Sequence, residues 1–287
     1  VLVSQGDGAG ALAAYQASLA LRTALAQRDP ANTQWQRDLS VSHNRIGDVL
    51  VSQGDGAGAL AAYQASLALR TALAQRDPAN TEWQRDLSVS HDKIGDVLVS
   101  QGDGAGALAA YQSGLAIALS LAQRDPANTQ WQRDLSISHD RIGNVLVAQG
   151  DGAGALAAYQ ASRALRTALA QRDPANTQWQ RDLSVSHNKI GDVLAAQGDG
   201  AGALAAYQSG LAIALSLAQR DPANTQWQRD LVVSNVKLST VVETGQRAHL
   251  ARALQIVRNL HETKRLAPVD AWMLDEFSRR LAALPDE

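Results

Sequence analysis

The stretch from Gln5 to Ser52 reads QGDGAGALAAYQASLALRTALAQRDPANTQWQRDLSVSHNRIGDVLVS, and it returns almost unchanged along the chain. Residues 53–100 repeat it with Glu82 for Gln34, Asp92 for Asn44 and Lys93 for Arg45. Further copies begin at Gln101, Gln149 and Gln197, and the last copy loses the pattern towards its end. A fixed 48-residue period indicates a solenoid, in which each unit buries its apolar face only against its neighbours.

Composition narrows the function classes. The 287 residues are 45% apolar, which is enough for a folded core, and the formal net charge is −2. A near-neutral chain has no electrostatic footprint for nucleic acid or an anionic membrane, so neither is an expected partner. The chain has no cysteine, so disulfides and thiolate metal sites are excluded. No uninterrupted apolar run approaches the ~20 residues that span a bilayer, and we expect a cytoplasmic, bacterial protein.

The first four residues, Val1 to Ser4, match Val49 to Ser52, which lie inside a repeat. We therefore expect the sequence to be a fragment of a longer array. After Leu231 the repeat decays into a divergent segment that ends with a predicted helix at Val269 to Leu284. Solenoids need such atypical terminal units to cover the last apolar face.

Residues 80–125 show how one copy folds. Thr81 followed by Gln84 resembles a capping box, which predicts that the first helix starts near Glu82. Gly102 suits the left-handed position after a helix, and Asp103 can cap the next one. The helical spacing of its apolar residues places one stripe along Trp83, Leu87, His91, Ile94 and Leu98.

The second helix is predicted from about Ala105 to Arg124, and Asp125-Pro126 ends it because a residue before proline avoids the α region. Its predicted inner side carries Leu108, Tyr111, Leu115, Leu119 and Ala122. We expect Gly106 and its copies to permit close helix–helix approach. A phosphate-cradling loop is the alternative, but no strand precedes this GxGxG spacing and no lysine follows it.

These residues together resemble the tetratricopeptide repeat (TPR). The resemblance rests on Ile94-Gly95, Leu98, Gln101-Gly102-Asp103, Ala107, Tyr111 and Asp125-Pro126, which recur in every unit up to about Leu260. The sequence departs from the family at Gly104, where an aromatic is usual, and at His91, where the family has Trp. The period is 48 instead of about 34 residues.

The resemblance implies an all-α fold, an α-solenoid of antiparallel helix pairs that forms a TPR-like right-handed superhelix with a C-terminal capping helix. We expect the array to cover residues 1–262, with residues 197–262 as its degenerate last copy, and the cap to cover residues 263–287.

One Trp, one Tyr and one His recur at fixed positions. The tryptophans (Trp35, Trp83, Trp131, Trp179 and Trp227) and the tyrosines (Tyr15, Tyr63, Tyr111, Tyr159 and Tyr207) are predicted core anchors. The histidines (His43, His91, His139 and His187) are predicted to be hydrogen-bonded core residues. Equivalent positions in adjacent units lie ~8–10 Å apart, too far to share one metal ion. We therefore expect no metal and no cofactor.

Catalysis has no foothold in the pattern. Active sites need different groups that converge on one point, whereas a repeat presents the same group many times. We expect that the chain is not an enzyme.

The polar side of the first helix is the predicted working surface, because in TPR proteins this side lines the groove that receives a partner. Asp and Asn dominate there, which disfavours the lysine-rich carboxylate clamp of chaperone-binding members and favours a basic or amide-rich partner. The alternative is a solvated face with local Arg85–Asp86 pairs of little energetic worth. The predicted groove residues are Arg37, Val41, Asn44, Asp48, Ser52, Arg85, Val89, Asp92, Asp96, Ser100, Arg133, Ile137, Asp140, Asn144, Arg181, Val185, Asn188 and Asp192.

Two functions follow as hypotheses. The first is a non-catalytic protein–protein interaction scaffold that presents a concave groove to a peptide or partner protein, within a longer regulatory or sensor protein. The second is structural, because near-identical units can stack end to end as a self-assembling or spacer array. The sequence gives no reason for the alternation between ASLALRT and SGLAIALS in the second helices.

Overall fold

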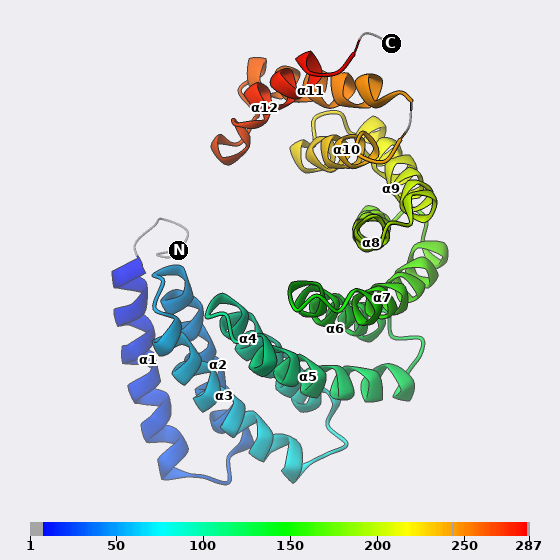
Figure 1. Cartoon of the computed structure of the whole chain (residues 1–287). Helices are drawn as coiled ribbons and strands as arrows, with labels where there is room; N and C mark the ends of the chain where they lie inside the picture. Colours follow the sequence, from blue (N-terminus) through cyan, green and yellow to red (C-terminus); the bar gives the residue numbers. More distant parts are fainter. Residues whose placement is uncertain (1–7, 243, 286–287) are drawn as a thin grey trace. The chain divides into compact units, whose positions relative to one another are not determined.

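A computed structural model describes residues 8–242 and 244–285, and helices account for nearly all of them (Figure 1). No strand is present in these described ranges. The chain divides into two compact units, residues 1–149 and 150–287, which are treated separately. In both units, antiparallel helices follow one another as predicted.

The first unit contains six helices, each packed on the next along the chain. They are α1 (Gly8–Arg28), α2 (Thr33–Ser52), α3 (Gly56–Arg76), α4 (Thr81–Ser100), α5 (Gly104–Arg124) and α6 (Thr129–Ala148). Even-numbered helices are the predicted first helices of each copy, and odd-numbered helices are the predicted second ones.

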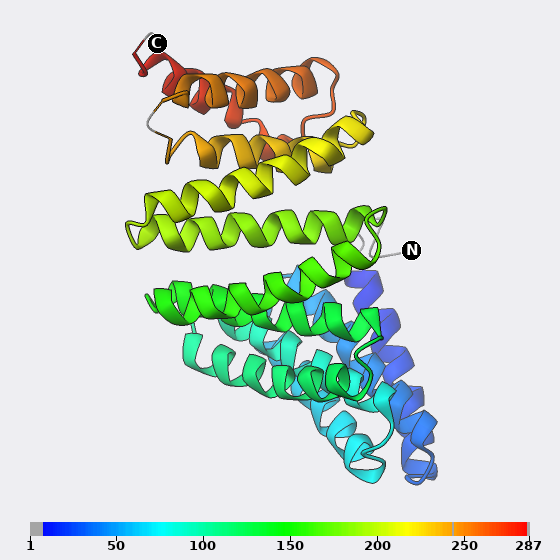
Figure 2. The same cartoon turned by 90° about the vertical axis from the view of Figure 1, so that its right-hand side faces the viewer.

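The second unit continues the same alternation and then departs from it (green to red in Figure 2). It contains α7 (Gly152–Arg172), α8 (Thr177–Ala196), α9 (Gly200–Arg220), α10 (Thr225–Leu238), α11 (Gln246–Glu262), the 3₁₀ turn η2 (Pro268–Asp270) and α12 (Met273–Ala282). The helix α10 is shorter than its counterparts, in keeping with the loss of the repeat pattern after Leu231.

Local residues start and stop each helix. Asn80, one residue before the predicted Thr81, is the N-cap of α4, and its side chain accepts a hydrogen bond from the Trp83 amide. Gly102 adopts φ +79° after α4, and Asp103 caps α5, as predicted. The explanation for Gly106 was wrong: a Cβ there would overlap the Asp103 carboxylate, so glycine makes room for the cap.

Close helix approach occurs instead at Gly95. A Cβ at this position would overlap the ring of Tyr111, and Gly47 and Gly191 face Tyr63 and Tyr207 in the same way. These tyrosines are buried, as predicted. The tryptophans are only half-buried, so the prediction of a Trp-centred core was too strong.

The buried side of the second helix also differs from the predicted one. In α5 the buried residues include Ala107, Ala118 and Leu121, whereas Leu119 is 41% exposed. Of the predicted inner residues, Tyr111 and Ala122 are buried, whereas Leu108 and Leu115 are half-buried.

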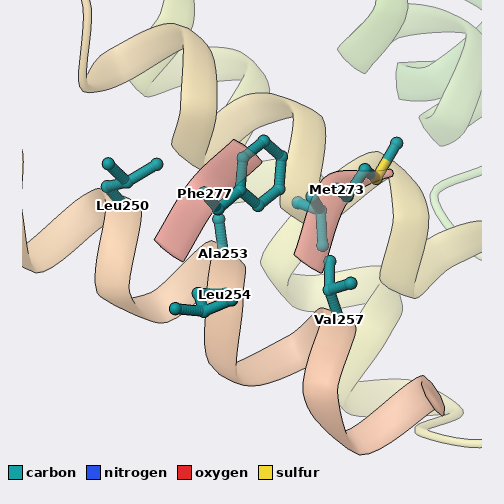
Figure 3. Close-up of a cluster of buried hydrophobic side chains, with 7 residues drawn as sticks. Leu250, Ala253, Leu254, Val257, Met273 and Phe277 are labelled. Carbon is teal, nitrogen blue, oxygen red and sulfur yellow. The ribbon is translucent and has the colours of Figure 1, made fainter. Parts of the chain in front are cut away.

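The C-terminal helices close the second unit with larger side chains. Val232, Leu250, Ala253, Leu254, Val257, Met273 and Phe277 form one buried cluster (Figure 3). The helix α12 packs on α11, shorter than the predicted span of 269–284.

Two helices, α5 and α9, are long and apolar enough by length and composition alone to cross a membrane. Neither is an uninterrupted apolar run, because polar residues such as Gln112, Ser113 and Ser120 lie within α5. Both take the same place in the helix succession as α3 and α7, which carry the buried charges Arg70 and Arg166.

Candidate functional site

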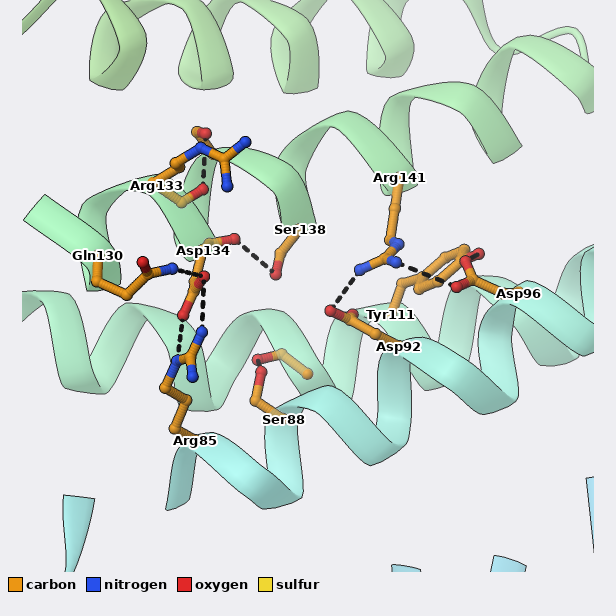
Figure 4. Close-up of polar contacts among 12 residues, drawn as sticks. Arg85, Ser88, Asp92, Asp96, Tyr111, Gln130, Arg133, Asp134, Ser138 and Arg141 are labelled. Atoms are coloured by element: carbon orange, nitrogen blue, oxygen red, sulfur yellow. Dashed lines mark hydrogen bonds and ion pairs between the residues drawn. The ribbon is translucent and has the colours of Figure 1, made fainter. Parts of the chain in front are cut away.

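The arginines of the predicted groove are bound to the next repeat. Arg37 Nε lies 2.8 Å from Asp86 Oδ2, and Arg85 Nε lies 2.6 Å from Asp134 Oδ2. In the second unit, Arg181 pairs in the same way with Asp230. The predicted local Arg–Asp pairs are thus contacts between repeats. Arg133 holds the same position on α6 (Figure 4).

The Asn or Asp side chain two helical turns after each of these arginines is buried. Asn44, Asp92, Asp140 and Asn188 are 7–9% exposed, so little of these four predicted groove residues lies at the surface. Even-numbered helices contact helices on both sides, and small serines allow this double packing. The buried serines of these helices are Ser40, Ser42, Ser88, Ser90, Ser136, Ser138, Ser184, Ser186 and Ser234.

The next acidic position joins a tyrosine to a cation. Asp96 accepts hydrogen bonds from the Tyr111 hydroxyl at 2.7 Å and from Arg141 at 3.1 Å, and its side chain remains 50% exposed. Asp48 is held by Tyr63 and Lys93, and Asp192 by Tyr207 and Lys237. The pKa of all three tyrosines is raised, mainly by burial and secondly by the adjacent carboxylate.

The remaining predicted residues divide by exposure. Val41, Val89, Ile137 and Val185 are half-buried, and Ser52, Ser100 and Asn144 are exposed. Sequence reasoning missed three exposed valines that belonged to neither predicted face. Val51, Val99 and Val147 are 50%, 49% and 48% exposed, at identical positions in successive copies.

Two pockets in the first unit repeat with the 48-residue period. One, of about 490 Å³, is lined by Asp48, Val51, Tyr63, Lys93 and Ser100 among others. The other, of about 640 Å³, is lined by their equivalents Asp96, Val99, Tyr111, Arg141 and Ala148. Each pocket therefore combines an exposed valine with the Asp–Tyr–cation cluster.

A third pocket of about 250 Å³ lies among α4, α5 and α6. It brings together the predicted groove residues Arg85, Val89, Asp92, Asp96 and Ile137. Desolvation raises the pKa of Asp92 to about 6, and Arg141 opposes this shift. Asp92 Oδ1 is buried and has no hydrogen-bond partner among the described residues.

The recurrent histidines are half-buried. Burial lowers the pKa of His43, His91, His139 and His187. The prediction of hydrogen-bonded rings is wrong for His187, whose buried Nδ1 has no hydrogen-bond partner in the described part of the chain. Within the same residues, no group of three or more His, Asp or Glu side chains is placed to hold a metal ion.

Solved structures match this fold. BtubC (BKLC) from P. vanneervenii aligns with a TM-score of 0.62 and 13% identity, over 98% of this chain and 94% of that one. The apo form of RapI aligns with a TM-score of 0.63 and 11% identity, over 98% and 70%. The nearly identical TPR-like repeats of a Podosopora anserina kinesin-light-chain-type protein align with a TM-score of 0.54 and 13% identity, over 79% and 96%.

No protein-family model matches the sequence, and no curated protein is significantly similar to it. At these identities the structural likeness shows the fold alone, a TPR-like α-solenoid. The resemblance that the repeated residues predicted is confirmed at that level.

Proposed function

We propose that this TPR-like α-solenoid is a non-catalytic scaffold that binds an extended segment of a partner protein along its even-numbered helices. The repeated pockets support this proposal most directly. Equivalent residues line cavities of about 490 and 640 Å³, and each cavity has a half-exposed valine in its wall. A segment that places one side chain in each pocket would gain apolar burial twice.

The polar groups of the pockets define the partner further. Asp96 keeps half of its side-chain surface exposed although Tyr111 and Arg141 bind it. A carboxylate so placed can accept one more hydrogen bond from an amide or a basic group. The proposed ligand is therefore a segment with apolar residues and intervening basic or amide side chains, and no cofactor is required.

A peptide library displayed on phage tests the proposal. Selection against the chain is expected to enrich peptides of this composition, and affinities are measured by fluorescence polarisation. The double variant Val51→Gln/Val99→Gln alters one wall residue in each repeated pocket without adding charge. It is expected to bind the selected peptides at least tenfold more weakly, because both apolar contacts are lost.

The matched control is Ala61→Gln/Ala109→Gln, which makes the same polar addition at exposed positions of α3 and α5 that line neither pocket. It is expected to bind like the parent. Equal binding by both double variants, with unchanged circular dichroism, would exclude these pockets as the binding surface.

A specific observation favours the structural alternative. Leu21 and Leu25 of α1 are 71% and 38% exposed, whereas Leu73, the equivalent of Leu25 in α3, is 4% exposed. An exposed apolar strip of this kind can carry end-to-end association. Light scattering would then report concentration-dependent oligomers that Leu21→Glu/Leu25→Glu abolishes.

The organisation of the chain is part of the same proposal. We propose that residues 263–287 cap an array formed by residues 1–262, and that the array serves a longer regulatory protein in the cytoplasm. The packing of α12 on α11 supports the capping role.

A further inference from the structure

Three arginines share one position on the odd-numbered helices: Arg70 and Arg166 are buried there, and Arg22 is half-buried. Arg70 Nη1 donates to the Asp86 carbonyl at 2.7 Å and to Ser90 Oγ at 3.0 Å. Arg22 and Arg166 make the equivalent pairs of bonds to the next even-numbered helix. Each guanidinium thus donates hydrogen bonds to the same two acceptors, a backbone carbonyl and a serine hydroxyl of the next even-numbered helix.

The helix α5 lacks this arginine but keeps its acceptors. Ala118 stands at the position of Arg70, and the pocket of about 250 Å³ opens beside it. Asp134 and Ser138, which are equivalent to Asp86 and Ser90, line that pocket (Figure 4). The change from ALRTA (residues 68–72) to AIALS (residues 116–120) therefore removes the internal cation, and the pocket lies beside the alanine that replaces it.

The residue opposite is also changed, from an amide to a carboxyl group. Oriented towards both of its partners, the Asn44 amide accepts from Arg70 at 2.8 Å and donates to Ser66 at 3.0 Å. Its counterpart Asp92 is 9% exposed, binds Arg141 through Oδ2 and has no partner among the described residues for Oδ1. Asp92 Oδ1 faces Gly114, which replaces the Ser66 that meets Asn44, so this buried carboxylate oxygen lacks a donor at a cost in stability.

The second unit contains a matched layer without the carboxylate. Ala214 replaces the arginine there, and Asn188 stands where Asp92 does. The Asn188 amide donates to Ser234 Oγ at 3.2 Å, which engages the serine equivalent to Ser138. Asn188 Oδ1 is also buried without a hydrogen-bond partner among the described residues, so the carboxyl group of Asp92 is what distinguishes the Ala118 layer.

We propose that the pocket beside Ala118 is a socket for an arginine side chain of the bound partner. The inference rests on the proposed scaffold function and names one residue of its ligand. A planar guanidinium carries five donors and can bind the Asp134 carbonyl and Ser138 Oγ as Arg70 binds their counterparts, with its charge towards the Asp92 carboxyl group. A lysine ammonium matches this arrangement less well.

The cations in the pocket wall are already paired with carboxylates. Arg85 pairs with Asp134, Arg141 with Asp92 Oδ2 and Asp96, and Lys93 with Asp48. The exposed Asp96 lines the same pocket as the buried Asp92, so the socket extends from the surface to the carboxylate.

Isothermal titration with N-acetyl-arginine amide tests the socket directly. N-acetyl-citrulline amide has the same shape without the charge and is expected to bind at least tenfold more weakly. Ala118→Arg is expected to abolish binding, because the chain's own side chain would fill the pocket as Arg70 does. Its control is Ala109→Arg, at an exposed position of the same helix, which is expected to leave binding unchanged.

A second variant, Asp92→Asn, restores the side chain that Asn44 and Asn188 supply elsewhere and is expected to weaken arginine binding at least tenfold while the chain stays folded. Equal binding of the arginine and citrulline probes, or unchanged binding to Ala118→Arg, would overturn the socket. If the scaffold proposal is right and only the socket is wrong, peptides selected for the repeated pockets would still bind the Ala118→Arg variant. If the scaffold proposal alone fails, the arginine probe binds but no peptide is selected.

Discussion

Single side chains decide the polarity of each layer between helices. Arg70 is 5% exposed, yet carbonyl, hydroxyl and amide oxygens surround its guanidinium. A buried charge persists only with such partners. Where alanine replaces the arginine, Asp92 retains the cost of burial without the full set of donors.

Substitution of Asp92 by Asn is therefore expected to stabilise the chain near neutral pH. The folded-state pKa of about 6 lies above the ordinary value of 3.8, so ionised Asp92 costs stability above pH 6. A gap of about two pKa units corresponds to a gain on the order of 1–3 kcal/mol at pH 7.5. Thermal melting of both proteins at several pH values measures this gain.

The sign of the effect sets the pH window. Protonation removes the cost in the folded state as the pH falls through 6, and the unfolded chain protonates near 3.8. The advantage of Asp92→Asn should shrink below pH 6 and vanish near pH 4. An advantage that stays constant from pH 7.5 to 4 would mean that Asp92 titrates normally.

At the scale of the helix, sequence periodicity predicted the order and the ends of the elements well. The left-handed Gly102 and the cap Asp103 follow from local chemistry, which a sequence shows directly. It did not predict the buried serines or Asn44, because one apolar stripe describes a helix with one buried face. Even-numbered helices have neighbours on both sides, so their second buried face is polar and small.

The close contact between Gly95 and Tyr111 gives a prediction for a single helix pair. Gly95→Ala would place a Cβ inside the space of the Tyr111 ring, and such overpacking costs about 1–3 kcal/mol. Denaturant unfolding is expected to show a lower midpoint with little change in slope. In the control Gly200→Ala, nothing lies within 4 Å of the added Cβ, so stability should be unchanged or slightly higher.

At the scale of the whole chain, residues that are close in the sequence of one copy form their ion pairs with the equivalent residues of the neighbouring copy. Arg37 pairs with Asp86, the copy of its neighbour Asp38, and Lys93 pairs with Asp48, the copy of Asp96 three residues beyond it. From the sequence, neighbours such as Arg85 and Asp86 were expected to pair with each other, because a single copy contains both charges. Only the offset between stacked helices decides which copy supplies the partner, and that offset depends on packing.

The recurrent histidines should make folding stability depend on pH, because the same side chain occupies the same half-buried position in four copies. Burial lowers the pKa of His43, His91, His139 and His187. The unfolded chain therefore takes up protons near pH 6.5 before the folded chain does, and stability present above that pH is lost as the pH falls.

The melting temperature is thus expected to fall between pH 7.5 and 5, and Asp92→Asn serves as the background because Asp92 titrates with the opposite sign. His249 also has a pKa lowered by burial, so five histidines contribute. Sites that are far apart contribute separately, so His43→Gln/His91→Gln should remove about two-fifths of the pH dependence. A melting temperature that is flat over this range, or a slope that the double variant leaves unchanged, would show that the histidines are solvated in the folded chain.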